Sequence, residues 1–311
     1  MASLDASAQG VYAIAATTFH PDGRLDLDGV GRLTDFYLGC GVSGLTILGV
    51  MGEAQKLDAA EALAVTRAVL SRTGTTPVIV GVSASGFAAM RSLAEAAMAA
   101  GAAGVMIAPP HTVRTDDAIV GYFAQAVAAI GGDAPFVIQD YPLVTGVSMT
   151  PGVIRRIAND HLSCRMLKHE DWPGLDKISA LRAMQRDGTL GPLAILCGNG
   201  GLFLDFELAR GADGAMTGYA FPDMLVDLVE ASHSGERRRV HDVFDAHLPL
   251  LRYEQQQGIG LAVRKYVLMR RGAMKSDAQR MPASKLSETS RAEVEFLLSR
   301  LAQHDLRANL S

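Results

Sequence analysis

Eight short apolar runs follow one another along about the first two thirds of the chain, separated by stretches with the apolar spacing of helices. Strand–helix repetition of this kind implies parallel strands joined by right-handed crossovers. The expected strands are residues 11–17, 44–48, 77–82, 104–108, 135–139, 164–168, 193–197 and 214–217. The expected helices are residues 26–38, 59–72, 90–100, 118–130, 151–159, 175–185 and 202–210. Eight strands within roughly 215 residues predict an α/β fold, a closed (β/α)8 TIM barrel.

A doubly wound open sheet is the alternative architecture. Such a sheet normally carries a glycine-rich phosphate-binding loop after its first strand. Residues 17–23 contain one glycine and have the composition of a turn, so the barrel is favoured.

The strand pattern stops after Pro222, and the remaining apolar spacing is helical. The expected helices there are residues 224–232, 236–256, 261–271 and 291–306. Ser290 and Glu293 form a capping-box pattern before the last of them. We therefore predict a barrel domain over residues 1–223 and a helical extension over residues 224–311, packed on the barrel or on a partner subunit.

Composition excludes several functional classes. The 311 residues are 49% hydrophobic and 20% charged, enough to bury a large core. A net charge of −4 gives no electrostatic footprint for nucleic acid or an anionic membrane. No apolar run is long enough to cross a bilayer, and the N-terminal residues lack a signal-peptide pattern. Three cysteines without a CxxC spacing fit reduced thiols, so we expect a cytoplasmic protein.

Lys168 ends the sixth expected strand, directly after an apolar run. Burial disfavours the charged form of a lysine and lowers its pKa, and a neutral amine can form a Schiff base with a ketone. Alternatively, the stem is buried while the ammonium reaches water. Lys168 taken alone fits this alternative better, whereas the neighbouring strand ends favour the Schiff base.

Barrel active sites lie at the carboxyl ends of the strands. The glycines of residues 49–52 leave backbone N–H groups that suit a carboxylate. His111 and His169 are candidate acid–base groups near neutral pH, and Asp140 and Glu170 are candidate general acids or bases. No His, Asp or Glu cluster has metal-ligand spacing, and Cys197 lacks an obvious histidine partner.

With these strand ends in place, the chain resembles the dihydrodipicolinate synthase and N-acetylneuraminate lyase family over nearly its whole length. Four features in order carry the resemblance. They are Gly49-x-x-Gly52-Glu53, Pro142-x-x-Thr145-Gly146, Lys168 at the spacing of the Schiff-base lysine, and Gly198-Asn199. The resemblance implies a class I aldolase or dehydratase that acts on a small 2-oxo acid, with no cofactor beyond the imine of Lys168. It also implies a homotetramer built from dimers, or a homodimer.

The sequence departs from the family pattern at its proton relay. Gln139 and His111 stand where the family usually has tyrosines, and Val50-Met51 replace a pair of threonines. An amide cannot relay protons as a phenol does. Val144 replaces the arginine that the synthase uses for its second substrate, which argues against dihydrodipicolinate synthase activity.

Two segments resemble a different branch of the family. Gln139-Asp140-x-Pro142 and residues 214–218 look more like the 2-keto-3-deoxy sugar-acid dehydratases, which include 2-keto-3-deoxyarabonate dehydratase.

The resemblance implies a mechanism in which Lys168 forms the imine and backbone groups of Val50, Met51 and Gly52 hold the substrate carboxylate. Gln139 is expected to hydrogen-bond without carrying a proton. Proton transfer is left to Tyr141, Asp140, His111, Glu170 or water. The remaining predicted substrate contacts are Glu53, Gly198 and Asn199. Dehydration and aldol cleavage both stay open, and the alternative class is a 2-oxo-acid-binding or regulatory protein that lost its relay.

Overall fold

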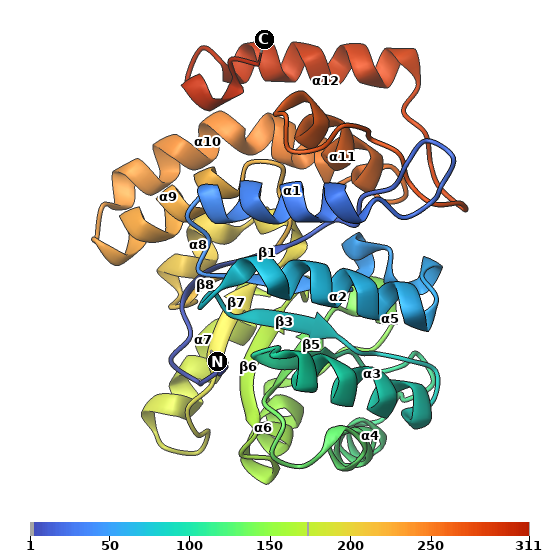
Figure 1. Ribbon diagram of the computed structural model, residues 1–311. Helices are drawn as coiled ribbons and strands as arrows, with labels where there is room; N and C mark the ends of the chain where they lie inside the picture. The colour runs from blue at the N-terminus through green and yellow to red at the C-terminus, as the bar shows by residue number, and fades with distance from the viewer. Residues whose placement is uncertain (1–2, 173, 311) are drawn as a thin grey trace.

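The computed structural model describes residues 3–172 and 174–310, and its eight strands form a closed parallel barrel in the order β1 to β8 (Figure 1). Each expected strand is confirmed, with ends that shift by a few residues. The strands are β1 Gly10–Ile14, β2 Gly44–Ile47, β3 Val78–Gly81, β4 Gly104–Ile107, β5 Phe136–Asp140, β6 Cys164–His169, β7 Ala194–Cys197 and β8 Gly214–Ala215.

Helices surround this barrel, and all of them except the four-residue α5 fall close to the expected ranges. They are α1 Leu27–Gly39, α2 Ala59–Thr73, α3 Phe87–Ala100, α4 Asp116–Ile130, α5 Pro142–Thr145, α6 Pro151–Asp160, α7 Leu175–Arg186, α8 Leu204–Ala209 and α9 Pro222–His233. Local chemistry sets several starts. Asp58, for example, forms a reciprocal capping box with Glu61 at the start of α2.

The core has two parts because strand side chains alternate between two faces. One part fills the barrel, where Ile14, Ile79, Val137 and Leu196 are fully or almost fully buried. The other lies between the strands and the surrounding helices. With both faces covered, the strands read as continuous apolar runs, which is what made them visible in the sequence.

The C-terminal extension consists of α10 Arg237–Glu254, α11 Gly260–Arg270 and α12 Glu288–Leu301. Figure 1 shows it stacked beyond α1 and α9, on the side of the molecule opposite α4 and α6. The predicted division at residue 223 stays a prediction. Helix α9, which starts there, contacts β1 and β8 and fills the position of the eighth barrel helix.

The predicted cap of the last helix was wrong. Ser287, and not Ser290, is the N-cap of α12, and its hydroxyl accepts the Ser290 N–H at 3.0 Å. Glu293 instead accepts the Tyr253 hydroxyl at 2.5 Å, which ties α12 to α10. A tertiary partner therefore outcompetes the local capping box.

Candidate active site

Lys168 lies near the carboxyl end of β6, inside the barrel mouth, and only 5% of its surface is exposed. Its ammonium nitrogen lies 2.8 Å from Oε2 of Glu170, whose side chain is equally buried. Strand alternation brings Lys168 and Glu170 to the same side, with His169 between them facing away. The position expected for the lysine is therefore the one observed, and its partner is a carboxylate.

Gln139 completes this group from the neighbouring strand, because the register of β5 and β6 pairs it with Lys168. Its Nε2 donates to the same Glu170 oxygen at 2.8 Å. Gln139 is therefore a hydrogen-bond donor to a buried carboxylate, and its expected role toward the substrate stays a prediction. Glu170 is thus held between the Lys168 ammonium and the Gln139 amide.

The loop after β7 holds the other side of Glu170. Asn199 donates its side-chain amide to the Glu170 carbonyl at 2.9 Å, and its backbone N–H approaches Glu170 Oε1 at 3.5 Å. A Cβ on Gly198 would lie 2.5 Å from the Glu170 carboxyl carbon. Gly198 is therefore needed for the close approach of Glu170, and Asn199 adopts a left-handed φ of 50°.

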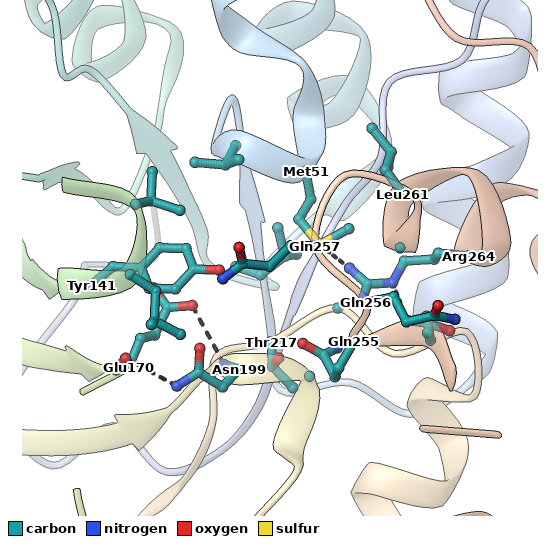
Figure 2. Close-up of a pocket in the computed structure, with 18 of the residues that line it drawn as sticks. Met51, Tyr141, Glu170, Asn199, Thr217, Gln255, Gln256, Gln257, Leu261 and Arg264 are labelled. Atoms are coloured by element: carbon teal, nitrogen blue, oxygen red, sulfur yellow. Dashed lines mark hydrogen bonds and ion pairs between the residues drawn. The ribbon is translucent and has the colours of Figure 1, made fainter. Parts of the chain in front are cut away.

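Lys168 and Glu170 line a cavity of about 380 Å³. Figure 2 shows Glu170 and other residues that line it. Gln139 and Tyr141 contribute polar groups from the end of β5, Asn199 from the turn after β7, and Thr217 from the end of β8. Burial, with a smaller contribution from the nearby Glu170 charge, raises the pKa of Tyr141 to about 12. The Tyr141 phenol therefore keeps its proton at neutral pH and acts as a hydrogen-bond donor.

Val50 and Met51 line the same cavity from the turn after β2. This turn uses the N–H of Gly52, which donates to the Gly49 carbonyl at 3.0 Å. Within the described residues, the N–H groups of Val50 and Met51 have no backbone acceptor. They are free to bind a carboxylate, whereas Gly52 is not.

Three residues from the predicted site lie elsewhere. Asp140 faces the outside of the barrel, where its carboxylate pairs with Lys177 at 2.7 Å. The buried Glu53 pairs with Lys56 and Lys265 and accepts the N–H of Arg280 at 3.1 Å, so its oxygens bind the C-terminal extension. His111 lines a second cavity of about 660 Å³, which shares Gln139 and Tyr141 with the first. Lys168 is therefore not brought together with Asp140 or Glu53.

The C-terminal extension supplies a wall of the cavity that the sequence did not reveal. Gln255, Gln256 and Gln257 line it from the loop between α10 and α11, and Arg264 lines it from α11. Buried Arg264 forms an ion pair with buried Glu254 and contacts the Met51 sulfur. No motif marks these residues, because their place depends on how the extension packs. The one signal was three glutamines in a row before a glycine, at the end of an amphipathic stretch.

Two kinds of feature are not found in the described ranges. No group of three or more His, Cys, Asp or Glu residues there is placed to hold a metal ion. A helix with the length and apolar character that a bilayer span requires is also not seen in this part of the chain.

The barrel and its buried lysine–carboxylate pair define a class of TIM-barrel protein with a small-molecule site at the strand ends. A sequence model described as the Dihydrodipicolinate synthetase family matches residues 7–301. The chain belongs to this family of lyases, whose relatives are named as dehydratases and aldolases.

Individual relatives carry different activity names. L-2-keto-3-deoxyarabonate dehydratase of Azospirillum brasilense is 31% identical, with 94% of both chains covered. A crystal structure of dihydrodipicolinate synthase from Rhodopseudomonas palustris is 62% identical, covers 96% of this chain and 100% of its own, and has a TM-score of 0.95. The structure of YagE from Escherichia coli K12 in complex with pyruvate is 25% identical, covers 94% and 98%, and has a TM-score of 0.84.

Proposed function

We propose that this lyase forms an imine between Lys168 and the C2 carbon of a 2-oxo acid, and that it acts as a 2-keto-3-deoxy sugar-acid dehydratase or as a pyruvate-dependent aldolase. The observation that carries the proposal is the 2.8 Å contact between the Lys168 nitrogen and the Glu170 carboxylate inside the cavity at the barrel mouth. A buried amine beside a proton acceptor is the arrangement that nucleophilic attack on a ketone needs. No cofactor is required, because the imine itself is the electron sink.

Glu170 has the geometry for the proton transfers that build the imine. It accepts a proton from the Lys168 ammonium, and the neutral amine then attacks the C2 carbonyl carbon to give a carbinolamine. Glu170 returns the proton to the carbinolamine oxygen, which leaves as water. The C=N bond that remains is an iminium, and Glu170 is again a carboxylate. Each transfer spans the distance of one hydrogen bond.

The iminium acidifies the C3–H bond, and a base removes this proton to give an enamine. In dehydration the enamine expels the C4 hydroxyl, which takes up a proton and leaves as water. In aldol cleavage the C4 hydroxyl loses a proton and the C3–C4 bond breaks, which gives the same kind of enamine and an aldehyde. Glu170 is the titratable carboxylate that lines the cavity beside Lys168, so we assign it the base role.

The N–H groups of Val50 and Met51 are proposed to hold the C1 carboxylate. Val144, which also lines the cavity, leaves no positive charge at the place where the synthase uses arginine. The synthase's arginine charge is therefore missing at Val144, and its tyrosine phenol is replaced by the amide of Gln139. Both differences favour the sugar-acid branch over dihydrodipicolinate synthase activity. The name of the Azospirillum relative agrees with this choice, whereas the 62% identical structure from Rhodopseudomonas palustris carries the synthase name. Turnover of a 2-keto-3-deoxy acid decides between the two activities.

Reductive trapping tests the proposal. The protein is incubated with pyruvate or a 2-keto-3-deoxy acid and borohydride, and peptide mass mapping is expected to find the adduct on Lys168. Lys168→Ala should lose both the adduct and turnover while its circular dichroism stays unchanged. Lys275→Ala, which removes an exposed lysine, is the matched control and should keep both. If no 2-oxo acid gives an adduct, the Schiff-base proposal is rejected.

The second candidate is a 2-oxo-acid-binding or regulatory protein. Gln139 in place of a proton-carrying phenol is the observation that favours it. It predicts thermal stabilisation by pyruvate without any product over a panel of 2-keto-3-deoxy acids. Free pyruvate with an aldehyde instead indicates cleavage, and an unsaturated or semialdehyde product indicates dehydration.

Location and assembly stay predictions of the sequence and its family resemblance. These are a cytoplasmic protein and a homotetramer or homodimer. Light scattering after size-exclusion chromatography measures the assembly.

A further inference from the structure

The loop between α10 and α11 brings a row of amides to the cavity from outside the barrel. Gln255, Gln256 and Gln257 all line the cavity that contains Lys168. Figure 2 shows Gln255 and Gln257 pointing into the space between Tyr141 and Arg264.

Close backbone packing fixes the shape of this loop. A Cβ on Gly260 would overlap the Glu254 carbonyl oxygen, so only glycine allows the chain to close there. Gly200 has a φ of 68°, and a Cβ on it would overlap the Gln255 amide. The loop therefore rests on the turn after β7, which is the turn that also holds Glu170.

Two of the three amides are left for a ligand. Gln256 donates its Nε2 to the Tyr253 carbonyl at 2.8 Å. Within the described part of the chain, the side chains of Gln255 and Gln257 have no hydrogen-bond partner. An amide both donates and accepts, which matches a hydroxyl group and gives no charge to an anion.

The charges around the cavity cancel in pairs. Its four charged lining residues are Lys168, Glu170, Glu254 and Arg264. Lys168 pairs with Glu170, and Arg264 pairs with Glu254. Arg264 and Glu254 are 2% and 1% exposed, so this pair is not available to a ligand without leaving a buried carboxylate unpaired.

We propose that the 255–257 loop selects substrates with an uncharged polyhydroxylated tail and rejects those with a phosphate or a second carboxylate at the far end. The proposal rests on the proposed Schiff-base function, which places the C1 carboxylate and the iminium at Lys168. A second anion would then enter a cavity whose remaining cation is already neutralised. Hydroxyls instead meet the free amides of Gln255 and Gln257.

The test compares 2-keto-3-deoxy acids of equal chain length that end in a hydroxyl, a phosphate or a carboxylate. We expect kcat/KM for the hydroxyl-terminated acid to exceed that for either anionic acid by about 100-fold or more. Gln255→Met and Gln257→Met should each lower kcat/KM for the neutral acid by roughly tenfold, mainly through KM. Gln125→Met removes an exposed amide on α4 and is the matched control, with no expected change.

Gln257→Lys tests the charge preference more directly, because it adds a cation to the cavity wall. Gln257 is exposed, so a lysine there is not expected to change the fold. It should raise kcat/KM for the anionic acids at least tenfold and shift the preference toward them. Equal turnover of neutral and anionic tails by the wild type, or an unchanged preference in Gln257→Lys, overturns the proposal.

Pyruvate separates this proposal from the one it rests on, because pyruvate has no tail. Borohydride trapping of pyruvate by the wild type therefore reports imine formation at Lys168 without any contribution from a substrate tail. Loss of trapping in the wild type would count against the Schiff base itself. If the protein binds without turnover, calorimetric dissociation constants for the same three acids give the preference, with the same expected order and the same overturning result.

Discussion

At the scale of single residues, Glu170 decides how Lys168 can act. One carboxylate oxygen lies 2.8 Å from both the ammonium of Lys168 and the amide of Gln139. In the proposed mechanism, this pair holds the transferable proton within one hydrogen bond of the attacking nitrogen. Gln139 holds the carboxylate in place without competing for the proton. The carboxylate of Glu170 is therefore the proton acceptor that contacts both Lys168 and Gln139.

Glu170→Gln tests this assignment. The amide has the shape of the carboxylate but accepts no proton, so we expect kcat to fall by about 10²–10⁴-fold with little change in thermal stability. Steady-state kinetics and a melting curve measure both quantities. Asp140→Asn provides the contrast, because it leaves buried Lys177 with one carboxylate partner fewer. Asp140→Asn should lower the thermal stability and change kcat by less than about tenfold. A large loss of kcat in Asp140→Asn together with a small one in Glu170→Gln would instead assign the acid–base role to Asp140.

Gly198 is the second residue that controls the position of Glu170, because a larger side chain there would collide with it. In Gly198→Ala the new methyl group must push the Glu170 carboxyl away from Lys168. We expect turnover to fall by about 100-fold, as misplacement near 1 Å does in a catalytic group. Gly121→Ala adds a methyl group in open space on α4 and is the control, with unchanged turnover. Full activity in Gly198→Ala would show that Glu170 does not need its observed position.

At the scale of elements, strand alternation explains which predicted residues reach the site. The sequence placed residues 139–141 and 168–170 at strand ends, but it did not show whether the strands continued that far. They do, since β5 runs to Asp140 and β6 to His169. Alternation therefore still applies, and it sends Asp140 and His169 outward while Gln139 and Lys168 face the cavity.

The strands were predictable because burial on both faces leaves a continuous apolar run. Most helices were predictable because burial along one side leaves apolar residues at helical spacing. Capping was less predictable, since it depends on which partner a side chain finds after packing. Ser287→Ala removes the hydroxyl that caps α12 and should lower the free energy of unfolding by about 1 kcal/mol. Ser290→Ala should cost less than half of this. Urea titrations measure both, and an equal or larger loss in Ser290→Ala would restore the capping position expected from the sequence.

At the scale of the whole molecule, the extension is part of the site as well as a cover for the barrel. Arg264 and the 255–257 loop lie near Lys168 only because α10 and α11 pack where they do. A contact between segments that lie about 90 residues apart leaves no local pattern, so sequence reasoning found the strand-end residues and missed this wall. Glu53 shows the same limit: its ion pair with Lys265 joins the turn after β2 to α11.

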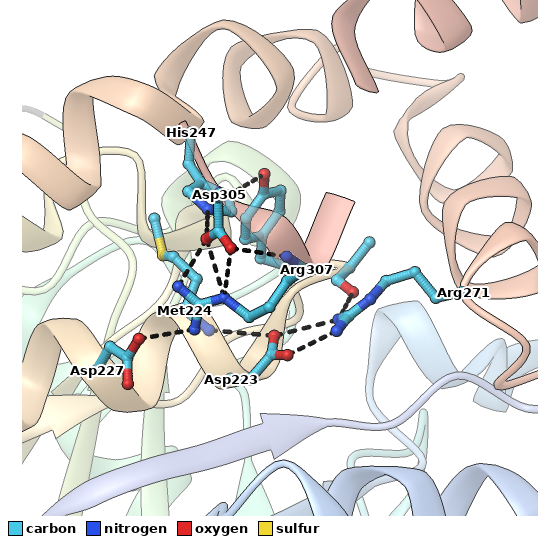
Figure 3. Close-up of polar contacts among 9 residues, drawn as sticks. Asp223, Met224, Asp227, His247, Arg271, Asp305 and Arg307 are labelled. Atoms are coloured by element: carbon cyan, nitrogen blue, oxygen red, sulfur yellow. Dashed lines mark hydrogen bonds and ion pairs between the residues drawn. The ribbon is translucent and has the colours of Figure 1, made fainter. Parts of the chain in front are cut away.

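A partly buried polar network holds the end of the chain against this extension (Figure 3). Asp305 accepts hydrogen bonds from His247 Nε2 at 2.8 Å and from Arg307 at 2.9 Å, and His247 Nδ1 lies 3.0 Å from the Tyr219 hydroxyl. Tyr219 follows Thr217 and Gly218, which line the cavity. The C-terminal residues are therefore linked to the site by one chain of contacts.

Asp305→Asn tests the contribution of this network through its pH dependence. Burial alone would raise the pKa of Asp305, but the hydrogen bonds from His247 and Arg307 outweigh it and hold this pKa well below its usual 3.8. Because the folded-state pKa is the lower one, the ionised carboxylate stabilises the fold above the unfolded pKa, and this stabilisation is lost as the pH falls toward the folded pKa. We expect Asp305→Asn to lower the free energy of unfolding by about 2 kcal/mol at pH 7, and the gap from wild type to narrow below about pH 4. Urea titrations from pH 7 to pH 3 measure the gap, with Asp133→Asn, in an exposed loop, as the control. A gap that stays constant over this range would mean that the charge of Asp305 does not stabilise the fold.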